Sequence, residues 1–174
     1  MQKDTQNQQE FDQIGRAVEQ QFHIKIASDG RWFHKGEEIH RKALVKLFST
    51  VLKRDTDGVF WLETPVEKGR IEVEDAPFIA TALTVERADD AKLDRNATLY
   101  FTTNVDEHVP LDMAHPLQML PTLDGSGMRP YIEIRDGLLA KLSRPVYYEL
   151  AARAITGDGG EIGVWSHDHF FVLE

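Results

Sequence analysis

The feature that most constrains the fold is an ordered set of residues that occurs twice along the chain. Each copy contains an Ile-x-Ile triplet, an Asp-Gly pair, an arginine followed six residues later by a leucine, a second Asp-Gly pair and a tryptophan. The first copy runs from Ile24 to Trp61 and the second from Ile132 to Trp165. We therefore expect two related units that arose by duplication.

Each unit is expected to begin with a β-hairpin and to continue into a helix. Asp-Gly between apolar runs favours a hairpin turn because both residues tolerate positive φ, which predicts turns at Asp29-Gly30 and Asp136-Gly137. Lys35-Gly36 is typical of a further turn. An apolar stripe predicts a helix over residues 40–53, and Pro145 fits the first turn of a second helix.

The rest of the chain adds strands to this plan. Alternating patterns predict strands over 59–63, 70–74, 79–87 and 97–103, and a helical period appears from Glu10 through Phe22. The proline-rich stretch 105–130 is expected to be irregular, with a short helix near Pro116–Leu120. The sequence thus predicts an α+β fold of two packed ββαβ-type repeats, the second richer in strands. The expected division is 1–21 as tail and helix, 22–78 as the N-terminal repeat and 79–174 as the C-terminal domain.

The composition excludes several classes of protein. No window approaches about 18 consecutive apolar residues, so we expect no membrane span. The chain contains no cysteine, which removes disulfides, thiolate metal sites and cysteine nucleophiles. No secretory signal is visible near Met1, and we expect a cytoplasmic protein.

The charge distribution bears on the choice of partner. The formal net charge is −9, and residues 88–174 carry 7 basic against 14 acidic side chains. Nucleic acid is disfavoured as a ligand, because binding to phosphates requires several basic groups. It remains an alternative through the basic strip of the 40–54 helix, which contains Arg41, Lys42, Lys46, Lys53 and Arg54.

No motif predicts a metal, a cofactor or a catalytic residue. The seven histidines lack an H-E-x-x-H pattern, and a calcium loop at Asp55–Gly58 would place Lys53 at a ligand position. Gly157–Gly160 lacks the lysine of a phosphate-binding loop, and Ser126 lacks the spacing of a nucleophile elbow. An enzyme is therefore the less favoured class. A hydrolase using acidic residues in the interdomain groove remains a further alternative.

A cluster of acidic residues gives the candidate binding site. Glu72 and Glu74 share one face of a predicted strand beside Thr64-Pro65, and they form either a solvated strand face or a charged edge at the domain junction. Arg41 and Arg144 each stand at a helix start, where acid is normally preferred, so we expect each to contact a carboxylate. The candidate groove residues are Arg41, Thr64, Glu67, Lys68, Glu74, Asp75 and Arg144.

The strings Thr64-Pro65-Val66-Glu67-Lys68 and Val73-Glu74-Asp75-Ala76-Pro77-Phe78 carry a family resemblance. Over residues 22–173 the chain resembles an uncharacterised family of proteobacterial conserved hypothetical proteins, a domain of unknown function. The resemblance implies a duplicated α+β core, a C-terminal domain with superficial likeness to pleckstrin-homology folds, a ligand groove at the domain junction and a role in signal transduction. It implies no catalytic residues.

The sequence thus favours a non-catalytic binding module whose partner occupies the groove between the domains. A protein or peptide is the expected partner, because an acidic chain suits a basic partner and exposed strand edges permit β-augmentation. The oligomeric state stays open.

Overall fold

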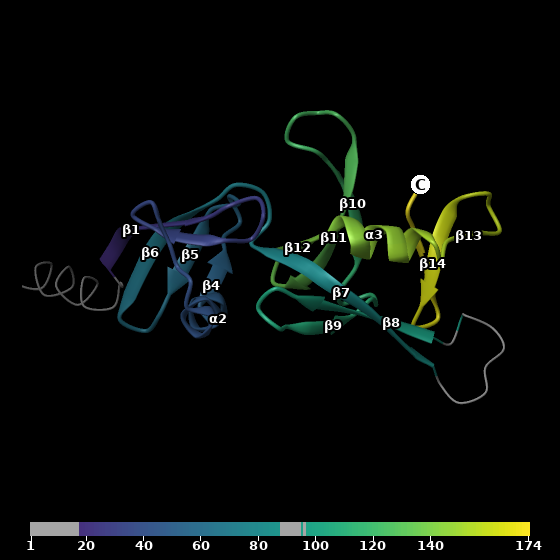
Figure 1. Cartoon of the computed structure of the whole chain (residues 1–174), viewed down its shortest axis with the longest axis horizontal. Coiled ribbons are helices and arrows are strands. Elements are labelled where there is room, and N and C mark those ends of the chain that lie inside the picture. Colours follow the sequence, from purple (N-terminus) through teal and green to yellow (C-terminus); the bar gives the residue numbers. More distant parts are fainter. Residues whose placement is uncertain (1–17, 88–94, 96) are drawn as a thin grey trace, which may run out of the picture.

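The computed structural model describes residues 18–87, 95 and 97–174. Two β-rich domains lie next to each other along the long axis, the N-terminal one in purple to blue and the C-terminal one in teal to yellow (Figure 1). The described residues form fifteen strands and two short helices, so the expected α+β organisation is present with strands predominating. Neither helix has the length and hydrophobicity of a membrane-spanning segment.

The N-terminal domain is built on a six-stranded sheet in the order β3-β2-β1-β6-β5-β4. Strands β1 and β6 pair in parallel, whereas all other neighbouring strands of this sheet are antiparallel. The elements are β1 (Val18–Ile26), β2 (Trp32–His34), β3 (Glu37–Glu38), α2 (Lys42–Thr50), β4 (Leu52–Arg54), β5 (Phe60–Glu63) and β6 (Glu67–Val73).

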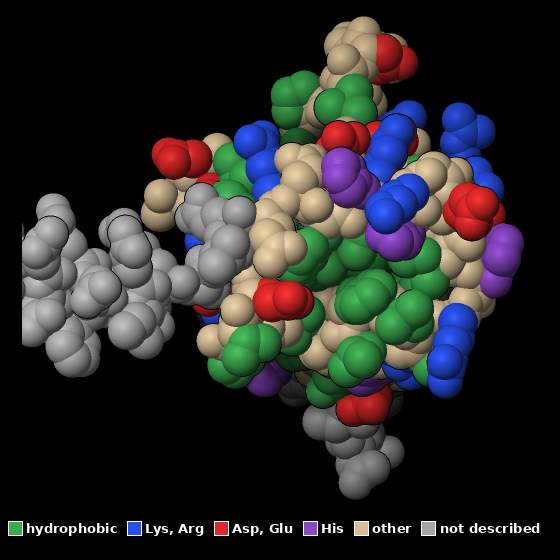
Figure 2. Space-filling model, turned by 90° about the vertical axis from the view of Figure 1, so that its left-hand side faces the viewer, with side chains coloured by type: hydrophobic (Ala, Val, Ile, Leu, Met, Phe, Trp, Pro, Cys, Tyr) green, Lys and Arg blue, Asp and Glu red, His purple; other side chains and the backbone are tan. Residues whose placement is uncertain are grey.

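Alternation along these strands creates one apolar face, which packs against α2. Ile24, Ile26 and Ile71 are buried in this core, and the ring of Phe48 on α2 stacks 6.3 Å from that of buried Trp32. The nine-residue helix covers only part of the apolar surface. Figure 2 looks onto the outer end of this domain, where hydrophobic side chains gather at the centre with basic and histidine side chains at the upper and right rims.

The C-terminal domain has a second six-stranded sheet and a smaller three-stranded one. The large sheet has the order β10-β11-β12-β7-β8-β9, and the small one the order β13-β14-β15. The elements are β7 (Phe78–Arg87), β8 (Ala97–Thr103), β9 (His108–Pro110), β10 (Leu117–Pro121), β11 (Met128–Arg135), β12 (Leu138–Leu142), α3 (Arg144–Ala151), β13 (Ile155–Thr156), β14 (Ile162–Ser166) and β15 (His169–Val172).

The small sheet is fixed to the large one through Ser166. This buried hydroxyl accepts a hydrogen bond from the Leu99 backbone N–H at 3.0 Å and donates one to the Leu111 carbonyl at 2.7 Å. Because both partners lie on or beside β8 and β9, the serine joins three elements of the core with its hydrogen-bonding capacity satisfied.

Both predicted Asp-Gly hairpins are confirmed. β1 and β2 pair on either side of Asp29-Gly30, and β11 and β12 pair on either side of Asp136-Gly137. The two glycines have φ of 85° and 74°, a conformation that L residues adopt only with strain. The turn at Lys35-Gly36 is also confirmed, α2 forms inside the predicted range 40–53, and α3 has Pro145 in its first turn as predicted.

Three predicted helical stretches are wrong. Residues 18–22 belong to β1, while residues 10–17 of the expected helix lie outside the described part of the chain. Phe22 packs over β6 because Gly69 leaves room for its ring; a Cβ there would lie 2.2 Å from it. Leu52 and Lys53 form β4 rather than the end of α2, because they pair with β5. Pro116–Leu120 form no helix either, since Leu117–Pro121 pair with β11 as an edge strand, where proline is tolerated.

Candidate functional site

The junction between the two domains centres on the Asp75 carboxylate. It accepts hydrogen bonds from the Tyr131 hydroxyl and from the Lys141 ammonium, each at 2.7 Å. The Lys141 ammonium also donates to the Ser28 carbonyl. One side chain of the C-terminal domain therefore contacts two segments of the N-terminal domain, the β1–β2 turn and the residue pair after β6. Burial, followed by the hydrogen bond to Asp75, raises the pKa of Tyr131 to about 12. The connection between the domains is therefore packed and polar.

A second contact joins the first hairpin turn to the C-terminal sheet. The Asn104 side chain accepts a hydrogen bond from the Ile79 N–H at 3.0 Å and donates one to the Gly30 carbonyl at 3.3 Å. A Cβ on Gly30 would lie 2.7 Å from the Ile79 side chain and 3.0 Å from the Asn104 amide nitrogen. Glycine is thus required at this turn both for its positive φ and for the close approach of the second domain.

A third set of contacts binds α2 to the C-terminal domain. Arg135 donates to the Glu107 carboxylate and, at 2.6 Å, to the Ser49 carbonyl near the end of α2. Lys46 and Lys42 lie 2.7 and 3.0 Å from the two oxygens of Asp106. Their hydrogen bonds, that of Lys46 first, hold the pKa of Asp106 below its ordinary value.

Of the predicted groove residues, Glu74 and Asp75 lie at the junction. Glu74 forms an ion pair with Lys25 at 2.6 Å and accepts a hydrogen bond from the Ser28 backbone N–H at 2.8 Å. The hydrogen bond from Lys25 is the main cause that lowers the pKa of Glu74. These two predicted residues therefore already have partners within the protein.

Thr64, Glu67 and Lys68 lie at the other end of β6. The Thr64 hydroxyl accepts a hydrogen bond from the Glu67 N–H at 3.1 Å in the turn between β5 and β6. The Lys68 ammonium lies 4.4 Å from the centre of the Trp61 ring. Because β6 has seven residues, about 20 Å of extended chain separates this turn from the junction.

Arg41 and Arg144 are exposed at the starts of α2 and α3. Within the described residues, neither side chain forms an ion pair or a hydrogen bond, so the expected contacts with carboxylates are not found there. The seven predicted residues consequently fall into separate places: the junction, the distal turn and the two helix starts.

A groove lies beside the junction on the N-terminal sheet. This cavity of about 410 Å³ is formed by β1, β6 and the turn before β5, and it includes Glu74. Arg54, which precedes that turn, donates to the Gly137 carbonyl of the other domain at 3.3 Å. The lining residues are Lys25, Gly58, Val59, Phe60, Arg70, Ile71, Glu72, Val73 and Glu74. We call this cavity the β6 groove.

Arg70 and Glu72 are the charged side chains of the β6 groove that the protein itself leaves without an ion pair, as far as the described residues show. Both are exposed on β6, and strand alternation places them on one face with Glu74. The acidic pattern places Glu72 and Glu74 on one strand face but does not include Arg70. Alternate residues of a strand share a face, so the residue two positions before Glu72, which is Arg70, could have been predicted from the same pattern.

Among the described residues, the carboxyl groups with a clearly shifted pKa share one direction of shift. The carboxyl groups whose pKa is clearly shifted, namely Asp29, Asp55, Glu74, Asp106, Asp112 and Asp124, are all shifted downward. A carboxyl that acts as general acid near neutral pH needs a raised pKa. Among the described side chains, no group of three or more His, Asp or Glu residues is arranged to hold a metal ion.

Two models of known protein families match the chain. Residues 14–76 match the N-terminal domain, and residues 77–173 the C-terminal domain, of a protein of unknown function called DUF1285. The chain belongs to the DUF1285 family. The family resemblance read from the sequence is thereby confirmed, and this DUF1285 chain divides between residues 76 and 77 in that description.

Two crystal structures of DUF1285 proteins resemble this chain. The one from Silicibacter pomeroyi DSS-3 is 36% identical with a TM-score of 0.82, and the match covers 92% of this chain and 85% of the other. The one from Shewanella baltica OS155 is 31% identical with a TM-score of 0.54, and covers 73% and 88%. A search of functionally curated proteins found no match.

Proposed function

We propose that this DUF1285 chain is a non-catalytic binding module that takes a charged polypeptide segment in the β6 groove. The observation that carries the proposal is the neighbouring pair Arg70 and Glu72, exposed side chains of opposite charge on one face of a strand. Residues two apart on a strand are spaced about 6.5–7 Å, the same interval as in a bound extended peptide. A peptide with an acidic and a basic side chain at positions two apart would complement them.

Position next to the junction supports a regulatory use of this groove. Glu74 lines the groove and is fixed to the Ser28 N–H, while Lys141 of the second domain donates to the Ser28 carbonyl. A partner that displaces Lys25 from Glu74 would therefore disturb the turn that the C-terminal domain contacts. This is the physical basis on which we extend the proposal to signal transduction.

The nucleic-acid alternative is weaker because four of the five side chains of the basic strip, all except Arg41, are engaged by the protein itself. Lys42 and Lys46 share Asp106, and Lys53 lies 3.0 Å from Glu63. Arg54 donates to the Gly137 carbonyl. Phosphate groups would have to compete with these contacts, and the charge available for counterion release is reduced accordingly.

The acidic groove residues predicted for the hydrolase alternative have other partners or lie elsewhere. Asp75 is bonded to Tyr131 and Lys141, and the pKa of Glu74 is lowered, mainly by its hydrogen bond with Lys25. Glu67 is exposed at the distal turn. We therefore keep the non-catalytic class.

We also infer that the two domains descend from one duplicated unit. Each contains a hairpin, a helix and three antiparallel strands in the same order: β1–β2, α2 and β4–β6 in the first, and β11–β12, α3 and β13–β15 in the second. In the first unit β6 pairs with β1, whereas in the second β10 occupies that side of β11. The likeness of the C-terminal domain to pleckstrin-homology folds is part of this proposal, supported by its antiparallel strands followed by α3.

Selection from a displayed library of random twelve-residue peptides tests the binding proposal. We expect enriched peptides with acidic and basic residues two apart, and at least about a tenfold loss of affinity when Arg70→Glu is combined with Glu72→Arg. Arg129→Glu, an exposed change on β11 of the other domain, is the control and should bind normally. Peptides that bind the double variant as well as the parent would overturn the proposal.

A further inference from the structure

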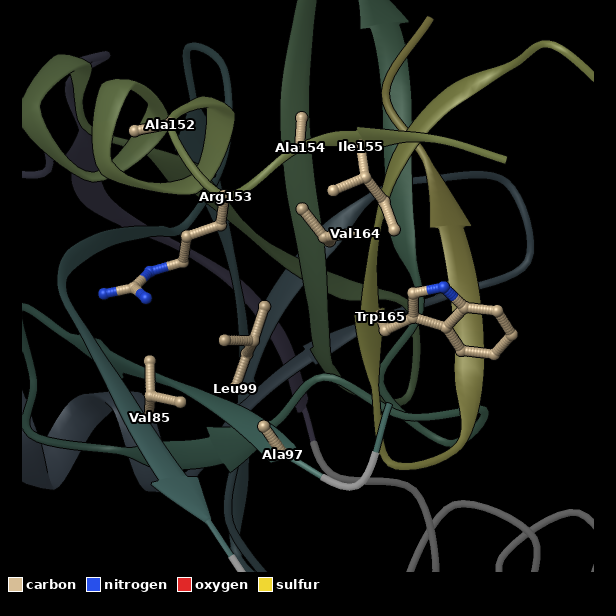
Figure 3. A pocket seen from close by; sticks show the side chains of 9 residues that line it. All are labelled: Val85, Ala97, Leu99, Ala152, Arg153, Ala154, Ile155, Val164 and Trp165. Atoms are coloured by element: carbon tan, nitrogen blue, oxygen red, sulfur yellow. The ribbon is translucent and has the colours of Figure 1, made fainter. Parts of the chain in front are cut away.

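The C-terminal domain contains a cavity that the β6 groove proposal does not use. It has a volume of about 300 Å³ and lies between the end of α3, the strands β13 and β14, and the paired strands β7 and β8 (Figure 3). This volume is at the lower end of the range found for small-molecule sites. Its lining residues are Val85, Ala97, Leu99, Ala152, Arg153, Ala154, Ile155, Val164 and Trp165.

The cavity exists because short side chains occur where its walls meet. Ala97 is on β8, and Ala152 and Ala154 lie in the connection between α3 and β13. The deeper wall is well packed, since Leu99 and Val164 are almost fully buried. The outer part of the cavity opens to solvent beside the exposed side chains of Arg153 and Ile155, so a ligand can enter it.

Arg153 is the one charged side chain among the described lining residues, and it is cationic. Figure 3 shows Arg153 entering from the connection after α3, with its guanidinium on the side of Val85, while Trp165 lies across the cavity. A second guanidinium, that of Arg95, lies 4.5 Å from the centre of the Trp165 ring. Among the described lining residues none is acidic, although residues 88–174 carry a net charge of −7. Positive charge at this cavity therefore runs against the charge of the surrounding domain.

Arg153 is free to exchange its partner. Its contact with Glu149 is long, at 3.4 Å, and the two side chains are 40% and 47% exposed. Exposed i,i+4 pairs of this kind contribute little to stability and are easily replaced. An anionic group on a ligand would form a shorter, charge-assisted pair with the guanidinium while the body of the ligand filled the apolar space.

From this geometry we propose that the cavity binds a small organic carboxylate with an apolar body, held by Arg153 at its acidic end. The apolar body lies against Leu99, Val164 and Ile155. Inorganic anions lack the part that fills the cavity, and neutral analogues lack the part that pairs with Arg153. The site is separate from the β6 groove, so either proposal can fail alone.

Isothermal titration calorimetry with three probes tests the assignment: 4-phenylbutyrate, its neutral amide and inorganic phosphate. We expect the carboxylate to bind at least about tenfold more tightly than the amide, and phosphate neither to bind nor to compete. Arg153→Met, which retains the apolar stem, should abolish the preference for the acid. Ala154→Leu should fill the cavity and remove binding of both organic probes while the thermal midpoint is kept or raised. Arg129→Met is the matched control and should behave as the parent.

A purely structural role for Arg153 gives a different result. A cation just after a helix can stabilise its carboxyl end. In that case Arg153→Met would lower the thermal midpoint slightly without changing the ratio of acid to amide affinity. Equal binding of acid and amide by the parent, competition by phosphate, unchanged binding in Ala154→Leu or no binding of phenylbutyrate would each overturn the proposal.

Discussion

The Lys141 ammonium lies 2.7 Å from the Asp75 carboxylate, and these side chains are only 13% and 8% exposed. An ion pair this far from solvent differs from the surface pairs of the chain, because removing one partner leaves the other charge buried. The pair also joins the end of the N-terminal domain to β12, so its loss affects the junction as a whole.

Replacing Lys141 by Met should lower the free energy of unfolding by about 3–5 kcal/mol, because Asp75 would be left as an uncompensated buried charge. Urea denaturation measures the change. The double variant Lys141→Met with Asp75→Asn should recover part of the loss. A Lys141→Met protein as stable as the parent would show that the junction does not depend on this pair.

Gly30→Ala should be more destabilising than Gly36→Ala. Both glycines have positive φ, of 85° and 86°, so each variant incurs a backbone cost of roughly 1–2 kcal/mol. A Cβ on Gly36 meets nothing within 4 Å, whereas one on Gly30 lies 2.7 Å from the Ile79 side chain. We expect an extra loss of about 1–3 kcal/mol for Gly30→Ala, from thermal or urea unfolding. Equal effects would argue against close contact of the first turn with the second domain.

Gly69→Ala should be strongly destabilising on its own and nearly harmless when Phe22 is already alanine. The Cβ would overlap the Phe22 ring, approaching it to 2.2 Å. Removing the ring removes the clash, so a double-mutant cycle in urea should show a coupling energy above about 1 kcal/mol. Additive effects would mean that Phe22 does not pack over β6, and the helical interpretation of residues 18–22 would regain support.

Tyr131 should release its proton at a higher pH than a free tyrosine side chain. Burial and the Asp75 hydrogen bond raise its pKa from 10.0 to about 12. Because the folded state then holds a proton that the unfolded state releases, stability from this group is complete below pH 10 and is lost as pH rises toward 12. In a pH titration followed by phenolate absorbance, the component that appears at the highest pH should be lost in Tyr131→Phe but not in Tyr148→Phe. Persistence of that component in Tyr131→Phe would contradict the assignment.

Glu74 should make stability depend on pH at the acidic end. Its hydrogen bond with Lys25 holds its pKa below the ordinary value of 4.5. The contribution of Glu74 to the free energy of unfolding is therefore present above pH 4.5 and is lost as the pH falls through the lowered pKa. Glu74→Gln should flatten the decline in urea midpoint below pH 4.5, whereas Glu133→Gln on β11 should not. Identical acid profiles for the parent and Glu74→Gln would contradict this.

Local signals made the turns and helices predictable. Asp29-Gly30 and Asp136-Gly137 form hairpins because the dipeptide itself favours the required backbone, and α2 follows its apolar stripe. The strand at 18–22 was mistaken for a helix because its environment comes from β6, more than forty residues away. β10 was not predicted because Pro116 and Pro121 stand at its two ends, and its pairing partner β11 gives no local signal within the strand itself.

The candidate site was predictable only in part, for the same reason. Glu74 and Asp75 stood out as an acidic cluster, but their partners come from distant segments. Lys141 reaches Asp75 across 66 positions and Asn104 reaches Gly30 across 74. The sequence next to Lys141 or Asn104 gives no signal for these contacts, because the partner of each side chain lies in a distant segment.

The parallel pairings also set an order of events while the chain is being synthesised. β1 is completed by β6, so the first sheet can close once the chain has been made as far as Val73. β7 must wait for β12, the strand that also brings Lys141 to Asp75. The N-terminal sheet can thus form on the ribosome while its neighbour is still incomplete. Asn104 and Asp106 can contact the N-terminal domain first, and the junction is complete once Tyr131, Arg135 and Lys141 have been made.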